Sequence, residues 1–94
     1  MELIIVAFPM VSLSFRVVPN LNELDNIQDE KQCWYNDLIP ECKKTIEEWD
    51  ISVIHVIGSP FNFINGLANQ IQNNFSNIKV NTIIADNEED KNND

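Results

Sequence analysis

The residues best suited to bind a small ligand are Gly58-Ser59-Pro60, directly after an apolar run with the composition of a strand. A helix starting here would offer free N–H groups and its dipole to an anion, and open α/β sheets bind ligands where a strand ends and a helix begins. One glycine is not a dinucleotide fingerprint, and Pro60 removes a donor. Ser59 as an ordinary helix N-cap explains the same residues. A ligand here would contact Gly58, Ser59, Asn62 and His55.

His55 is the only histidine of the chain. It lies in the middle of a strand-like run with Val53 and Ile57 on its face, so we expect a neutral core side chain with one hydrogen-bonded nitrogen. Catalysis would need a nucleophile or a carboxylate close by, and the sequence places neither there. We therefore assign no catalytic residue.

The two cysteines, Cys33 and Cys42, lie nine positions apart without a neighbouring histidine. This spacing fits neither a zinc site nor a redox Cys-x-x-Cys motif. We expect two reduced thiols in a cytoplasmic protein that has no metal and no cofactor.

The chain is acidic, with a formal net charge of −9 over 94 residues and only six lysines and arginines. Affinity for nucleic acids and for anionic membranes comes mainly from basic side chains, so we expect neither as a partner. A basic protein surface is the natural counterpart. The acids we expect to meet it share one face of a predicted helix and are Glu30, Asp37, Glu41 and Glu48.

A second candidate interface is the segment 61–77, which contains no charged residue. Charge depletion is typical of the centre of an interface, and a glycine lets another backbone come close. A bias toward asparagine, which the C-terminal residues share, also explains the segment. The outward positions of the predicted helix include Asn62, Gly66, Asn69 and Asn73.

Apolar patterning predicts four strands. Residues 3–8 and 51–57 are apolar on both faces, as in central strands, whereas 11–18 alternates and 79–85 is short and mixed, as at sheet edges. Strands 3–8 and 11–18 should form an antiparallel hairpin. Strand 11–18 would then leave an edge free to pair with a second copy or a peptide.

Two helices complete the predicted fold. An apolar stripe extends from Leu24 to Trp49 and keeps its phase across Pro40, which favours one bent helix over two helices with Pro40 in the first turn of the second. The second predicted helix covers about 60–75.

The predicted order is β-β-α-β-α-β, a single small α/β domain on the border of α+β, over residues 1–85. Its four-stranded mixed sheet would have the order 2-1-3-4. This topology resembles a shortened ribonuclease-H-like core, although neither residues 6–8 nor 55–58 offer the carboxylates that hold magnesium in those nucleases. Residues 86–94 are predicted to be a disordered acidic tail.

We therefore expect a non-enzymatic protein–protein interaction domain, in its most concrete form an acidic inhibitor or adaptor of a basic, for example nucleic-acid-handling, protein. The alternative is a small-ligand-binding or enzymatic domain that uses the junction 58–62. A further alternative is a structural homodimer.

Overall fold

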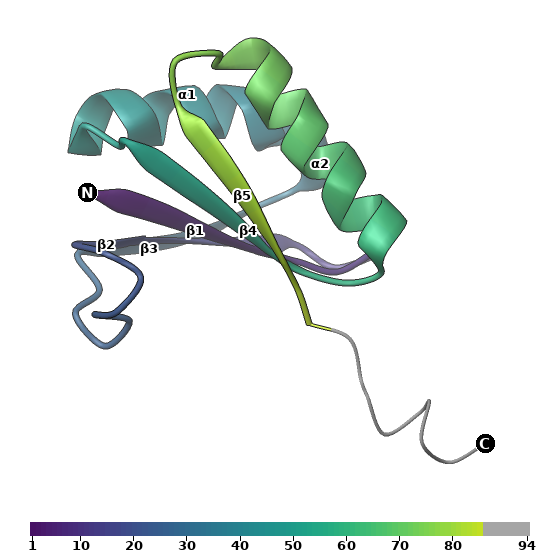
Figure 1. Ribbon diagram of the computed structural model, residues 1–94, viewed down its shortest axis with the longest axis horizontal. Coiled ribbons are helices and arrows are strands. Elements are labelled where there is room, and N and C mark those ends of the chain that lie inside the picture. Colours follow the sequence, from purple (N-terminus) through teal and green to yellow (C-terminus); the bar gives the residue numbers. More distant parts are fainter. Residues whose placement is uncertain (86–94) are drawn as a thin grey trace.

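Two helices and a five-stranded mixed sheet form a small α+β domain in the computed structural model, which describes residues 1–85 (Figure 1). The predicted tail at 86–94 lies outside the described residues. In chain order the elements are β1 (Glu2–Ala7), β2 (Leu13–Val18), β3 (Asp29–Cys33), a 3-10 turn η1 (Tyr35–Asp37), α1 (Leu38–Trp49), β4 (Val53–Gly58), α2 (Phe61–Asn74) and β5 (Lys79–Ile84).

The sheet order is β3-β2-β1-β4-β5. The predicted hairpin is confirmed, because β1 pairs antiparallel with β2. The predicted parallel neighbours are also confirmed, since β1 lies beside β4 and β4 beside β5. The four predicted strands therefore keep their predicted relative order.

The predicted four-stranded sheet is wrong in one respect: a fifth strand, β3, pairs antiparallel with β2 and forms the edge. The expectation of a free edge at 11–18 is therefore also wrong. Residues 29–33 read Asp-Glu-Lys-Gln-Cys, a composition that favours helix over strand. Pairing with β2, through bonds such as Gln28 N–H to Val17 O (2.7 Å), overrides this local preference.

The prediction of one bent helix from Leu24 to Trp49 is wrong because Asp29–Cys33 form the strand β3. The helix α1 begins only at Leu38, so Pro40 occupies its first turn. A proline is tolerated there because the first N–H groups of a helix have no intrahelical partner. The alternative of two helices with Pro40 in the first turn of the second is right for the second helix, α1, but wrong for the first, since β3 and η1 lie there instead.

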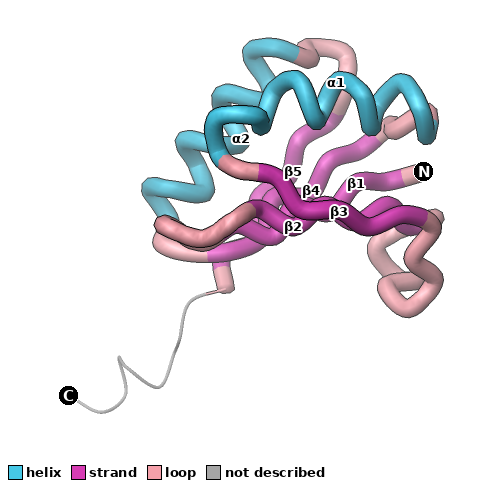
Figure 2. The backbone as a smooth tube through the Cα atoms, turned by 180° about the vertical axis from the view of Figure 1, so that it is seen from behind, coloured by secondary structure: helices cyan, strands magenta, loops and turns pink. Residues whose placement is uncertain are grey.

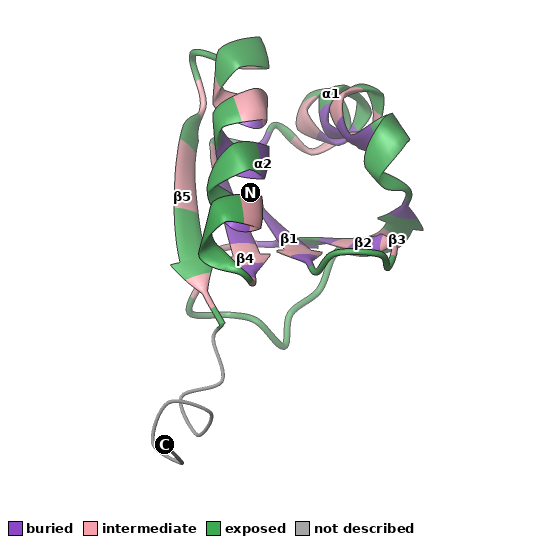
Figure 3. Ribbon diagram, turned by 90° about the vertical axis from the view of Figure 1, so that its right-hand side faces the viewer, coloured by how far each residue is buried: buried purple, intermediate pink, exposed green. Residues whose placement is uncertain are grey.

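Both helices cover the same face of the sheet, α1 over the side of β2 and β3 and α2 over β4 and β5 (Figure 3). The core lies between the helices and the sheet. Its largest fully buried side chain is Phe15, and the aliphatic members with zero exposure include Leu3, Ile5, Ile54, Val56, Ile64 and Ile71.

Strand directions decide which loops share an end of the sheet. β1, β3, β4 and β5 run in one direction and β2 runs against them. Loops 8–12, 34–37 and 59–60 therefore meet at the end where β1 and β4 finish, and loop 19–28 lies at the opposite end (Figure 2).

Candidate functional site

Exposed apolar side chains gather at the end of the sheet where β1, β3 and β4 finish. The register brings Ala7 beside Gly58, and Leu13 beside Cys33, so the residues that follow or precede these pairs emerge at one end. Of the ten large apolar side chains that are exposed within residues 1–85, six lie here. We call this set the apolar end: Phe8, Met10, Val11, Trp34, Tyr35 and Phe61.

The exposure of these side chains is large. Met10 is 99% exposed, Trp34 64% and Phe61 55%. Single exposed apolar residues are common on protein surfaces, whereas groups of them mark interaction sites. Tryptophan and tyrosine are also the residue types that contribute most to binding free energy at interfaces.

One aromatic residue of this end, Tyr35, is held by packing. The Tyr35 ring stacks on Phe63 with a centroid separation of 6.1 Å and an angle of 29° between the ring planes. Phe63 belongs to α2 and is half-buried, so the stack fixes η1 against α2. The segment that carries Trp34 is therefore anchored on its C-terminal side.

Met10 has an unusual backbone as well as a fully exposed side chain. Its φ of +69° lies in the left-handed region, which costs a non-glycine residue about 1 kcal/mol or more. The Asn-Gly or Gly residues usual in tight turns would avoid this cost. Folding alone thus gives no reason for a methionine at this position.

Within residues 1–85, the segments that form the apolar end carry little charge. Asp37 is the only charged residue in segments 8–12, 34–37 and 58–63. The next acid along α1, Glu41, pairs with Lys31 at 2.9 Å and Lys44 at 3.5 Å. The hydrogen bond from Lys31 is the main cause that lowers the pKa of Glu41, which therefore stays ionised and paired.

The predicted ligand junction falls within this end, but with different chemistry. The N-cap of α2 is Pro60 without a side-chain cap bond, so the prediction of Ser59 as the cap is wrong. A Cβ on Gly58, whose φ is +155°, would lie 1.7 Å from the carbonyl oxygen of Ala7. Gly58 is therefore required for the close approach of β1 and β4, independent of any ligand, and Asn62 is simply exposed.

The expected core position of His55 is confirmed, since the side chain is buried and its Nε2 shares a 2.8 Å hydrogen bond with Glu2 Oε1. The expectation of no nearby carboxylate is wrong, because pairing of β1 with β4 brings together residues 53 positions apart. The register neighbours of His55 are Ile4 and Asn81, neither of which is a nucleophile. His55 also lies in mid-strand, away from the apolar end.

The predicted acidic face does not form. Its four members lie on three elements: Glu30 on β3, Asp37 in η1, and Glu41 and Glu48 on α1. Glu30 is paired with Arg16 at 3.1 Å, and Glu41 with Lys31 and Lys44. The expectation required one continuous helix, which the strand β3 replaces.

The predicted outer face of α2 does form. Asn62, Gly66, Asn69 and Asn73 are all exposed, and a Cβ on Gly66 would have no neighbour within 4 Å. Gln72 of the same helix is half-buried, and its side-chain amide donates to Phe75 O and Ile78 O. It ties the end of α2 to the start of β5.

Both cysteines are free and buried in the core. Desolvation raises the pKa of Cys33 to about 11 and that of Cys42 to about 12. Since the thiolate is the reactive form, neither side chain has the environment of a nucleophile.

Within residues 1–85, no group of three or more histidine, cysteine, aspartate or glutamate side chains is placed to hold a metal ion. None of the helices there has the length and apolar composition needed to cross a membrane.

Comparison with known proteins found no matching family model, curated protein or solved structure. The functional conclusion therefore depends on the geometry of this chain.

Sequence reasoning missed the apolar end because it assigned Trp34 and Tyr35 to the buried stripe of a helix. Their true surroundings depend on β3, which has no apolar pattern. The available signal was the β1–β2 turn, Phe8-Pro9-Met10-Val11, which has three large apolar residues where polar turn residues are usual.

Proposed function

We propose that this chain is a non-enzymatic protein–protein interaction domain that binds its partner through the apolar end. The observation that carries the proposal is the concentration of Met10, Trp34 and Phe61 at one end of the sheet, on two loops and the first turn of α2. Their side chains contribute nothing to the core, yet the fold brings them to one end.

The composition of this end supports a protein partner over a small ligand. Exposed aromatic and methionine side chains on separate segments offer a wide surface, and burying an aromatic side chain removes roughly 150–250 Å² from water. Interfaces are enriched in these residue types and depleted in lysine and glutamate at their centre. Within residues 1–85, segments 8–12, 34–37 and 58–63 have this composition, with Asp37 as their one charge.

The net charge of −9 supports a basic partner. Opposite charge accelerates the encounter of two proteins, whereas the desolvated apolar contacts keep the complex together. We therefore infer an inhibitor or adaptor that acts on a basic protein with an apolar site. In this form the acids attract the partner and the apolar end binds it.

The test compares matched losses of apolar surface at the two ends. Trp34→Ser with Phe61→Ser removes two exposed side chains from the apolar end, and Leu24→Ser with Ile27→Ser removes two from loop 19–28. Wild type and both variants are immobilised and exposed to lysate of the source organism at low and high salt, with quantitative mass spectrometry of the bound proteins.

We expect one basic protein whose capture falls at least about tenfold in the first variant, equivalent to about 1.4 kcal/mol, and is retained in the second. High salt should reduce its capture by all three proteins. Equal capture by both variants would contradict binding through the apolar end.

A further inference from the structure

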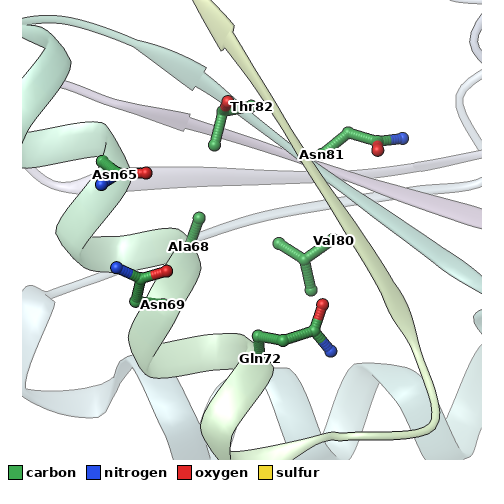
Figure 4. Close-up of a pocket in the computed structure, with 7 residues that line it drawn as sticks. All are labelled: Asn65, Ala68, Asn69, Gln72, Val80, Asn81 and Thr82. Carbon is green, nitrogen blue, oxygen red and sulfur yellow. The ribbon is translucent and has the colours of Figure 1, made fainter.

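The second surface without an assigned role is the strip formed by β5 and the adjoining face of α2. A hollow of about 540 Å³ lies there (Figure 4), and the view shows Val80 and Thr82 pointing from β5 toward α2. Its lining is Asn65, Ala68, Asn69, Gln72, Val80, Asn81 and Thr82. We refer to these residues as the amide strip.

The outer edge of β5 has no strand beside it within residues 1–85. Ala85 N–H donates to Gly58 O at 2.8 Å, so alternate residues back along the strand, Ile83 and Asn81, also face β4. The N–H and C=O groups of Val80, Thr82 and Ile84 consequently point outward. They form a template for another strand.

The two edge strands of the sheet, β3 and β5, differ in the charged residues that hinder pairing with another chain. β3 has a row of charged residues, of which Glu30 and Lys31 are in ion pairs. Charged residues on an edge strand prevent pairing with another chain. β5 has no charge after Lys79, no proline and no bulge in its register with β4. The edge at β5 is therefore open to strand addition.

The amide strip is suited to a second copy of this chain in particular. Two chains of net charge −9 repel each other, but α2 has no charged residue and β5 has only Lys79. Carboxamide, hydroxyl and backbone edge groups each include a donor and an acceptor, so each can pair with its own copy. A charged side chain cannot pair favourably with its own copy. This matters because a two-fold interface brings identical patches together.

We propose that two copies pair antiparallel through β5 and extend the sheet across a two-fold axis at Thr82. The outward residues then face one another as Thr82 with Thr82 and Val80 with Ile84. The amide groups of Asn65 and Asn69 flank the joined strands. This surface is separate from the apolar end, so a dimer keeps both partner-binding ends free.

The test is the mass of the full-length protein in solution, by sedimentation equilibrium over a wide range of concentration. Thr82→Pro removes an outward N–H and leaves the bonds between β4 and β5 intact, because prolines are tolerated at edge positions of this kind. Thr82→Val retains the N–H and is the matched control. We expect a dimer for wild type and Thr82→Val, and at least about tenfold weaker association for Thr82→Pro.

Amide hydrogen exchange of wild type gives an independent readout. At concentrations that favour the dimer, the amides of Val80, Thr82 and Ile84 should be protected, and dilution should release them while Asn81 and Ile83 stay protected. A single-chain mass at the highest concentration, or Thr82→Pro associating as tightly as wild type, would overturn the proposal. Protected outward amides with a single-chain mass would overturn it too, since the edge would then have another occupant.

Discussion

The two ends of the sheet both carry exposed loops, but their chemistry is opposite. At the apolar end, exposed aromatic and methionine side chains lie on segments whose only carboxylate within residues 1–85 is Asp37. At the other end, the exposed Leu24 and Ile27 belong to a loop that also holds acids, and α1 finishes there with more. The acids of this second end that form no ion pair within residues 1–85 are Glu23, Asp25, Glu47, Glu48 and Asp50.

This difference separates surface that water covers from surface suited to a partner. Burying a carboxylate without a counter-ion costs several kcal/mol, so the acidic end favours hydration. The apolar end offers burial without that cost. Exposure alone therefore does not favour one end as the proposed binding site, whereas exposure with little charge nearby within residues 1–85 favours the apolar end.

The largest expected effect is on the fold beneath the apolar end. Gly58→Ala places a Cβ 1.7 Å from Ala7 O at a φ of +155°, and we expect a loss of at least about 3 kcal/mol in unfolding free energy. Gly66→Ala is the matched control in open space on a helix, where alanine should add about 0.5–1 kcal/mol. Urea unfolding of both variants measures this. Equal effects would contradict the close approach of β1 and β4 at this end.

The free energy of unfolding should fall at high pH, because the core contains the buried thiol of Cys42. The pKa of Cys42 rises from its ordinary 9.0 to about 12, with desolvation as the main cause. Because the folded-state pKa is the higher one, stability is complete below pH 9 and is lost as pH rises toward 12. The loss is about 1.4 kcal/mol per pH unit for this thiol.

Cys42→Ala should start from a lower stability, because it leaves a cavity, but lose less as pH rises. Unfolding free energies measured at several alkaline pH values give the two slopes. Parallel curves for wild type and Cys42→Ala would show that burial of this thiol has no such effect.

These predictions also separate what the sequence could reveal from what it could not. The strands β1, β2, β4 and β5 and the helix α2 follow from apolar runs and alternation, which are local signals. The strand β3 does not, because its polar residues adopt strand geometry only through pairing with β2. Because the sequence analysis missed β3, it misplaced Trp34 and Tyr35, two of the six residues of the apolar end.

At the candidate ligand junction 58–62, local sequence again predicted only part of what the structure shows. Its position at Gly58 was predictable, since a glycine between a strand and a helix is a local feature. Its chemistry was not, because it depends on Phe8, which follows the residue paired with Gly58, and on Tyr35, which stacks on Phe63 of α2. Both are far from Gly58 in sequence.

Met10 should separate stability from binding at the apolar end. Met10→Gly relieves the left-handed backbone at φ +69°, so we expect an unfolding free energy equal to wild type or up to about 1 kcal/mol higher. The same change removes a fully exposed apolar side chain and should weaken capture of the partner severalfold. Thermal unfolding and the capture experiment give the two readouts. A variant with lower stability and unchanged capture would assign Met10 to folding alone.

The smallest effect concerns the ion pairs beside the apolar end. Glu41→Gln removes its attraction to Lys31 and Lys44 and should cost less than about 1 kcal/mol at neutral pH. Because the pKa of Glu41 is lowered in the folded state, this contribution is present above its ordinary 4.5 and disappears as pH falls through the lowered value. Glu48→Gln, at the acidic end, should change nothing measurable in urea unfolding. A larger loss of unfolding free energy for Glu48→Gln than for Glu41→Gln would contradict the assignment of the stabilising ion pairs to Glu41.

The most direct measurement places a photo-crosslinking amino acid at Trp34 in one protein and at Leu24 in another, both expressed in cells of the source organism. The two positions are similarly exposed and lie at opposite ends of the sheet. Binding through the apolar end predicts a discrete cross-linked product from position 34 with none at the same mass from position 24. The same product from both positions, or from position 24 alone, would contradict it.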